Sequence, residues 1–230
     1  MRSFVLSIFM GALLFSCEST SNKVTPSRPA HRSFFYTYDT IPKIYQYRDQ
    51  VNGMYEQFHR VYGIRDGYGR HIIVERYTQE GRLTEAYNFN LDSLNVIDHM
   101  VVDVNGEKEK ALVYKNKLFP LNDTTVTHFA SKFSGIADSQ VILYERFREV
   151  SAFEKRTILD KEQDCMKLNE SIRVTNVDIE SQMENELSNE LVSYFGKDIG
   201  LVEWHDAKFS QHFVLEKIIS QKSWINLISG

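Results

Sequence analysis

Residues 66–90 read DGYGRHIIVERYTQEGRLTEAYNFN, and this stretch decides the fold class. The turn signals Asp66-Gly67-Tyr68-Gly69 and Glu80-Gly81 flank two segments that are rich in Ile, Val, Tyr and Phe. Asp-Gly pairs adopt the positive φ angles of tight hairpin turns. Runs of β-branched and aromatic residues between such turns predict antiparallel strands that follow one another along the chain.

The same pattern recurs on both sides of this stretch. Asn52-Gly53 and Asn105-Gly106 divide further apolar segments, and residues 96–103 alternate imperfectly between apolar and polar side chains. Such strands face a core on one side and are only partly wetted on the other. The sequence therefore predicts a mainly β, single-domain fold: a curved antiparallel meander or half-open barrel with one or two short helices.

One segment changes its period. Val126, Phe129, Ala130 and Phe133 follow the spacing i, i+3, i+4, i+7, and Gly135 lies just beyond them. This spacing predicts a short amphipathic helix. Two later segments are less distinct. Residues 141–150 predict a strand, although their Glu and Arg content leaves a helix open, and the polar residues 181–189 predict a loop or a marginal helix.

The C-terminal part carries a family-like pattern. Asp164-Cys165-Met166-Lys167-Leu168 is followed by residues 193–204, SYFGKDIGLVEW. Over roughly residues 153–220 the order resembles exported half-barrel lipoproteins of the LolA and LppX type. The glycines at 196 and 200 permit a sharp turn and close strand approach, and residues 201–204 and 213–219 are expected to form the last hairpin. The resemblance implies an apolar concave face that carries lipid. The alternative is that aromatic side chains simply fill the core; examples are Tyr45, Tyr47, Phe89 and Phe213.

The N-terminus resembles the leader of bacterial lipoproteins. Arg2 precedes an apolar run over residues 4–15, which is too short to span a bilayer. The run ends in Leu14-Phe15-Ser16-Cys17, which reads as a lipobox. The resemblance implies cleavage between Ser16 and Cys17, with diacylglycerol and an N-acyl group such as palmitate attached to Cys17. An ordinary secretory signal that is cleaved elsewhere is the alternative.

These features divide the chain into three parts. We expect a signal peptide over 1–16, the lipidated cysteine with a flexible tether over 17–33, and a β-rich globular domain over 34–230. The tether contains two of the four prolines and almost no apolar residues. The predicted location is the bacterial cell envelope, lipid-anchored and in the outer membrane. Residues 18–20 leave the periplasmic and surface faces both open.

Composition limits the partners. The chain carries a formal net charge of −4 without a basic run, which argues against nucleic-acid binding. Its 42% hydrophobic residues suffice for a core. An acidic body gains nothing from anionic lipid headgroups, so the acyl anchor is expected to make the membrane contact. Once Cys17 is acylated, Cys165 has no disulfide partner, and we expect it to be a core residue.

The sequence offers little support for catalysis. His205 and His212 flank the last predicted hairpin loop, with Asp206 nearby, and these residue types suit zinc or iron. No HExxH, GxSxG, P-loop or GxGxxG motif occurs, however. We therefore expect a non-catalytic binding or assembly module for an apolar ligand or an envelope protein partner, without metal or cofactor. The alternative is an envelope hydrolase or metal-binding enzyme with a site near His205 and His212.

Overall fold

The computed structural model describes residues 30–103, 105–137, 139–208 and 210–229. The predicted leader and its lipidation site, Cys17, lie outside these residues. The described chain forms twelve strands, which are followed by one α-helix. The strands are β1 (Lys43–Asp49), β2 (Glu56–Asp66), β3 (Gly69–Tyr77), β4 (Leu83–Asn90), β5 (Val96–Val102), β6 (Lys108–Asn116), β7 (Thr127–Ser134), β8 (Gln140–Ile158), β9 (Lys161–Asp178), β10 (Glu184–Gly196), β11 (Gly200–Asp206) and β12 (His212–Ser220).

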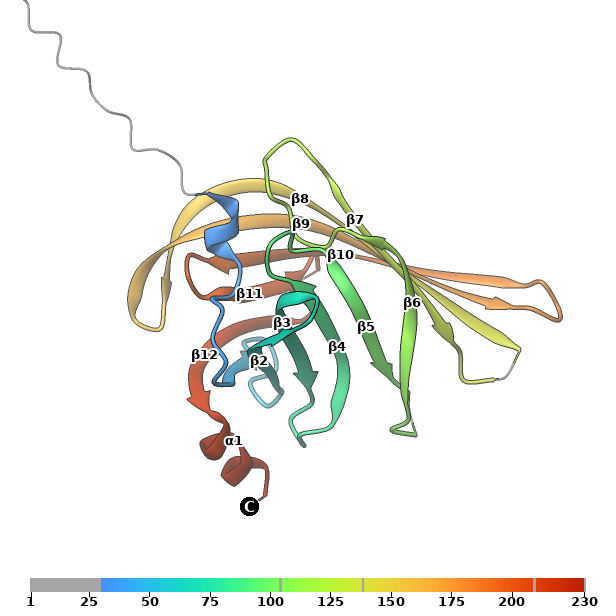
Figure 1. Cartoon of the computed structure of the whole chain (residues 1–230), viewed down its shortest axis with the longest axis horizontal. Helices are drawn as coiled ribbons and strands as arrows, with labels where there is room; N and C mark the ends of the chain where they lie inside the picture. Colours follow the sequence, from blue (N-terminus) through green and yellow to red (C-terminus); the bar gives the residue numbers. More distant parts are fainter. Residues whose placement is uncertain (1–29, 104, 138, 209, 230) are drawn as a thin grey trace, which may run out of the picture.

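The strands form a closed up-and-down barrel (Figure 1). Each strand pairs antiparallel with the next along the chain, as tight hairpins require. β1 also pairs with β12, from Lys43 opposite Ser220 to Asp49 opposite Phe213, and this pairing closes the sheet. The predicted mainly β meander is thus confirmed, and the barrel is closed rather than half-open.

The helix predicted over residues 126–133 is wrong, because this segment is strand β7. The same residues also satisfy a period of two, with Phe129, Ser131 and Phe133 on one face. β7 lies between β6 and β8 and pairs with both, which satisfies its backbone groups on each side. Partners distant in sequence therefore override the helical spacing.

The two less distinct segments are both strands. The strand predicted over 141–150 is confirmed and forms part of β8. The loop or marginal helix predicted over 181–189 is wrong for most of its length, because β10 begins at Glu184. Exposed polar residues make this part of β10 resemble a loop, but its backbone pairs with β9 from Glu184 onward. Together β9 and β10 project beyond the barrel wall as a long hairpin (Figure 1).

A short N-terminal segment plugs one end of the barrel. A 3-10 helix, η1 (His31–Phe34), lies over this end, where Phe34 is fully buried against Phe153. The next residue, Phe35, packs edge-on against Phe89 and Phe119. Residues 31–33 were expected to belong to the flexible tether but are ordered in η1, because burial of His31 and Phe34 offsets the entropy of ordering them. We call this end, with the β2–β3, β4–β5 and β10–β11 turns, the closed end.

A glycine makes the closed end possible. Gly200 has φ +98°, and a Cβ added there would lie 2.2 Å from a ring carbon of Tyr36. The expected close approach at Gly200 is thus present, and it is the N-terminal segment that approaches. Around it the main hydrophobic core gathers side chains from most of the barrel, and Cys165 is fully buried within this core as expected.

The α-helix lies outside the barrel. α1 (Gln221–Ile228) begins after Ser220, whose hydroxyl accepts a hydrogen bond from the Ser223 amide at 3.1 Å. Trp224 packs against Phe58 and Tyr77 and forms a second, smaller core. The expectation of one or two short helices is met, but at this position and at η1 rather than at 126–133. No helix within the described ranges is long and apolar enough to cross a membrane.

Candidate ligand-binding site

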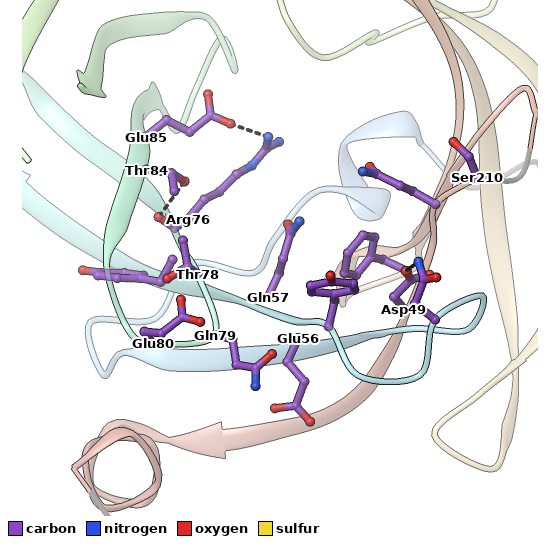
Figure 2. Close-up of a pocket in the computed structure, with 15 residues that line it drawn as sticks. Asp49, Glu56, Gln57, Arg76, Thr78, Gln79, Glu80, Thr84, Glu85 and Ser210 are labelled. Carbon is purple, nitrogen blue, oxygen red and sulfur yellow. Dashed lines mark hydrogen bonds and ion pairs between the residues drawn. The ribbon is translucent and has the colours of Figure 1, made fainter. Parts of the chain in front are cut away.

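The end opposite the plug is hollow, and we call it the open end. It is formed by the β1–β2, β3–β4 and β11–β12 connections, which enclose an outer cavity of about 750 Å³ (Figure 2). Amide, hydroxyl and carboxylate groups dominate its lining, with three aromatic rings among them. The lining residues are Asp49, Asn52, Tyr55, Glu56, Gln57, Arg76, Tyr77, Thr78, Gln79, Glu80, Thr84, Glu85, Ser210, Gln211 and Phe213.

A smaller cavity, which we call the inner hollow, lies deeper in the barrel. Its volume is about 160 Å³, and it shares Gln57 and Arg76 with the outer cavity, so the two spaces adjoin. Its remaining lining residues are His59, Tyr144, Arg146, Ile172, Leu191, Ser193, Leu201 and Trp204. The outer cavity at the open end therefore adjoins a hollow that is lined by ionisable groups within the barrel.

The first charged group joins β3 to β4. Arg76 and Glu85 lie opposite each other in the register and form an ion pair. Glu85 also accepts a hydrogen bond from the Tyr87 hydroxyl at 2.7 Å, and its other contact is His99 at 3.5 Å. Burial opposes ionisation of Glu85, but Arg76 outweighs it and, with His99, lowers the pKa of this carboxyl well below its usual range. The pair is thus charged at neutral pH.

The second charged group joins β8, β9 and β10. Arg146 and Arg148 both contact Glu170 through their Nε atoms, at 2.5 and 2.9 Å, and Ser193 donates to the same carboxylate. Burial raises the pKa of Glu170, but the two guanidinium groups outweigh it and lower the pKa to about 2. Burial and the neighbouring Arg146 lower the pKa of Arg148. Two arginines therefore share one buried carboxylate as their ion-pair partner.

His59 differs from these groups because it lacks a polar partner. Its ring is 1% exposed, and neither ring nitrogen has a hydrogen-bond partner among the described residues. It stacks on Trp204, with ring centroids 5.6 Å apart at 16°, and contacts Tyr47. Burial, together with the nearby Arg76, lowers the pKa of His59 well below its usual range. The imidazole is therefore neutral and faces the inner hollow with one donor and one acceptor.

The predicted pair His205 and His212 lies on a different surface, outside the barrel. The two residues face each other across the β11–β12 hairpin as expected, with ring centroids 5.6 Å apart. The carboxylate of Asp206 accepts hydrogen bonds from the amide and hydroxyl of Ser210, and its main-chain oxygen lies 3.1 Å from His205 Nδ1. His212 contacts Glu203 at 3.0 Å instead.

Glu203 belongs to an ion-pair cluster on that outer surface. Arg156 donates to both carboxylate oxygens of Glu203, at 2.7 and 2.8 Å, and lies over the ring of Tyr194. Within the described ranges no group of three or more His, Cys, Asp or Glu side chains is arranged to hold a metal ion. Nearby Cys165 is not a reactive thiol, because burial raises its pKa to about 12.

Sequence reasoning missed the charged residues inside the barrel. A signal for them exists, because each stands in phase with the apolar face of its strand. Arg76 continues the inward positions Ile72 and Val74, and Glu85 precedes Tyr87 and Phe89 in the same way. A charge in phase with a buried face indicates an interior polar group.

Two solved structures are similar to this chain. No family model and no curated protein matches it. A protein from Parabacteroides distasonis that is assigned as a lipoprotein aligns at 12% identity and a TM-score of 0.46, covering 81% of this chain and 98% of that one. A protein from Bacteroides fragilis that is assigned as exported, with a YmcC-like fold, aligns at 12% identity and a TM-score of 0.47, covering 84% and 100%.

At these identities and TM-scores, neither structure carries an argument about what this chain binds or does.

Proposed function

We propose that this chain is a lipid-anchored cell-envelope lipoprotein whose barrel is a non-catalytic binding module for a polar ligand, which enters through the open end. The observation that carries this proposal is the outer cavity, which leads inward from that end and is lined mainly by polar groups. Concave sites that combine aromatic rings with several convergent polar groups are typical of ligand binding.

The lining favours a polar ligand over an apolar one. Asn52, Gln57 and Gln79 offer amides, Thr78 and Ser210 offer hydroxyls, and the aromatic rings are few beside them. An apolar ligand would strip these groups of water without replacing their hydrogen bonds, which is unfavourable. The apolar side chains instead fill the closed end as core.

The course of the chain agrees with an anchor at Cys17. The described chain enters at the closed end, where His31 and Phe34 are buried. A membrane attachment upstream of this point leaves the open end unobstructed. The thirteen residue steps from Cys17 to Ala30 span at most about 45 Å when fully extended.

Mass spectrometry tests the anchor. The mature protein is expected to begin at Cys17 and to carry diacylglycerol and an N-acyl group, and Cys17→Ala is expected to abolish both. An unmodified Cys17, or a mature start downstream of it, contradicts the anchor.

Native mass spectrometry tests the binding module. Residues 18–230 contain every described residue and therefore the whole barrel, and they are purified after export without detergent. We expect a polar small molecule to be released from the wild type.

Gln79→Trp, which fills the outer cavity from its exposed turn, is expected to lose this molecule. Lys108→Trp, on the exposed β5–β6 hairpin, is the matched control and is expected to retain it. Release of lipid alone, or equal release from Gln79→Trp, contradicts a polar ligand at the open end.

A further inference from the structure

The charges around the inner hollow do not balance. Two arginines line it, Arg76 and Arg146, and Arg148 adjoins them through the shared contact with Glu170. Among the described residues, two carboxylates form ion pairs with these three guanidinium groups, namely Glu85 and Glu170. The neighbouring His59 is neutral and therefore does not change this count of charges. This group of side chains therefore carries an excess of one positive charge inside the barrel.

Unpaired polar atoms accompany that charge. The Nε atom of Arg76 has no hydrogen-bond partner among the described residues, and neither has either ring nitrogen of His59. A quarter of the Arg76 side chain remains accessible, although the residue lies inside the barrel. Buried polar groups are normally hydrogen-bonded, so donors left free around a cavity indicate a place for an acceptor.

The inner hollow has the size of a small charged group. Its volume of about 160 Å³ corresponds to roughly five water molecules in the liquid. It adjoins the outer cavity at Gln57 and Arg76, so a ligand in the outer cavity lies next to it. Guanidinium forks bind carboxylate and phosphate through paired hydrogen bonds.

We propose that the inner hollow binds the oxyanion of the ligand, a carboxylate or a phosphate, through Arg76, Arg146 and His59. This inference rests on the proposed function and adds the ligand's charge and its orientation. The anionic end lies deep in the barrel, where one negative charge balances the excess, and the uncharged polar remainder lies in the outer cavity.

Trp204 supplies the readout, because it lines the inner hollow and stacks on His59. The chain contains one other tryptophan, Trp224, so Trp224→Phe leaves Trp204 as the sole reporter. Residues 18–230 with this change are titrated with inorganic phosphate and with acetate at constant ionic strength. Glycerol is the neutral control. We expect a saturable change in Trp204 fluorescence with phosphate, with acetate or with both, and none with glycerol. The anion that binds more tightly identifies the oxyanion as phosphate or carboxylate.

Two variants assign the effect to the proposed residues. His59→Phe keeps the stacking on Trp204 but removes both ring nitrogens. We expect anion binding to weaken at least about tenfold. The midpoint of thermal unfolding is expected to be unchanged or higher. Arg76→Gln combined with Glu85→Gln removes an ion pair without leaving a lone charge and is expected to weaken binding similarly. Arg60→Gln with Glu75→Gln is the matched control, because that pair, at 3.0 Å, lies on the outer face of β2 and β3.

The outcomes separate this inference from the proposed function. The oxyanion site is overturned if neither anion gives saturation, or if His59→Phe and the Arg76–Glu85 double variant bind as tightly as the control pair. If the ligand released in native mass spectrometry still binds the double variant unchanged, the outer cavity remains the binding site and only the oxyanion inference fails. If Gln79→Trp also retains that ligand, both proposals fail.

Discussion

The two ends of this barrel differ in their packing: one is filled with apolar side chains, and the other is hollow and mostly polar. The closed end is filled by aromatic side chains, among them Phe34 and Phe35, and it belongs to the main hydrophobic core. The open end holds a cavity of about 750 Å³ whose lining is mostly polar. Filling one end with core stabilises the fold, and this leaves the other end free to present polar groups to the ligand that we propose. The comparison therefore predicts that stability and binding respond to different substitutions.

Removal of a side chain from the plug is expected to have the largest effect. Phe34 is fully buried against Phe153, so Phe34→Ala should lower the free energy of unfolding by about 3–5 kcal/mol. Urea unfolding followed by circular dichroism measures this loss. Phe133→Ala is the control, because Phe133 is only half-buried and lies toward the β7–β8 hairpin on the opposite side of the barrel. Equal losses in the two variants would contradict the distinction between the ends.

The buried carboxylate of Glu170, between the two ends, is expected to make the free energy of unfolding depend on pH. The pKa of Glu170 is about 2 in the folded chain, against an ordinary value of 4.5. Its lowered pKa contributes stability that is fully present above about pH 4.5 and is lost as the pH falls toward 2. The loss is on the order of 3 kcal/mol. Urea unfolding at several pH values across this range measures it.

Glu170→Gln provides the matched comparison. It leaves Arg146 and Arg148 without their shared carboxylate, so it is expected to be less stable than the wild type at pH 7. Its stability should also change less between pH 4.5 and 2, because the titrating group is gone. Parallel pH profiles for the two proteins would show that Glu170 does not carry the effect.

A smaller effect is expected at the glycine beneath the plug. Gly200→Ala places a methyl group 2.2 Å from the Tyr36 ring at a positive φ, and we expect a loss of about 1–3 kcal/mol. Gly106→Ala separates the two causes, since Gly106 also has a positive φ but nothing lies within 4 Å of an added Cβ. The excess loss at Gly200, read from thermal unfolding, measures the contact with the plug. If Gly200→Ala loses no more stability than Gly106→Ala, the N-terminal segment shifts to accommodate the added methyl group.

The rim of the open end is expected to contribute least to stability. Gln79 lines the outer cavity from an exposed turn, so Gln79→Ala should change the free energy of unfolding by less than about 0.5 kcal/mol. The same urea experiment tests this, with Phe34→Ala as the reference for a structural position. A loss above 1 kcal/mol would show that the rim supports the fold rather than a ligand.

Local patterns predicted most of the strands correctly. Turn residues such as Asn52-Gly53 and Asn105-Gly106 do separate consecutive strands, because positive φ and hairpin geometry are properties of a few neighbouring residues. The last hairpin, expected from residues 201–204 and 213–219, is present as β11 and β12. Prediction failed at β7 and at the start of β10, where pairing with distant strands decided the conformation.

The candidate site could be predicted far less well than the fold. His205 and His212 are adjacent across a hairpin, so the sequence predicted their proximity, but it did not reveal that they lie outside the barrel. The site inside the barrel combines Arg76 and Glu85 with Arg146 and Glu170, which are far apart along the chain. No local pattern brings them together.

The sequence by itself determined the antiparallel meander, the acidic body and the lipobox prediction at Leu14 to Cys17, because each depends on composition or on residues close in the chain. Only the tertiary structure decided that β1 meets β12, that residues 31–36 plug one end, and that three arginines gather in the interior. The physical reason is closure. Once the sheet closes, every inward side chain faces all the other strands, and which charges then meet depends on the barrel as a whole.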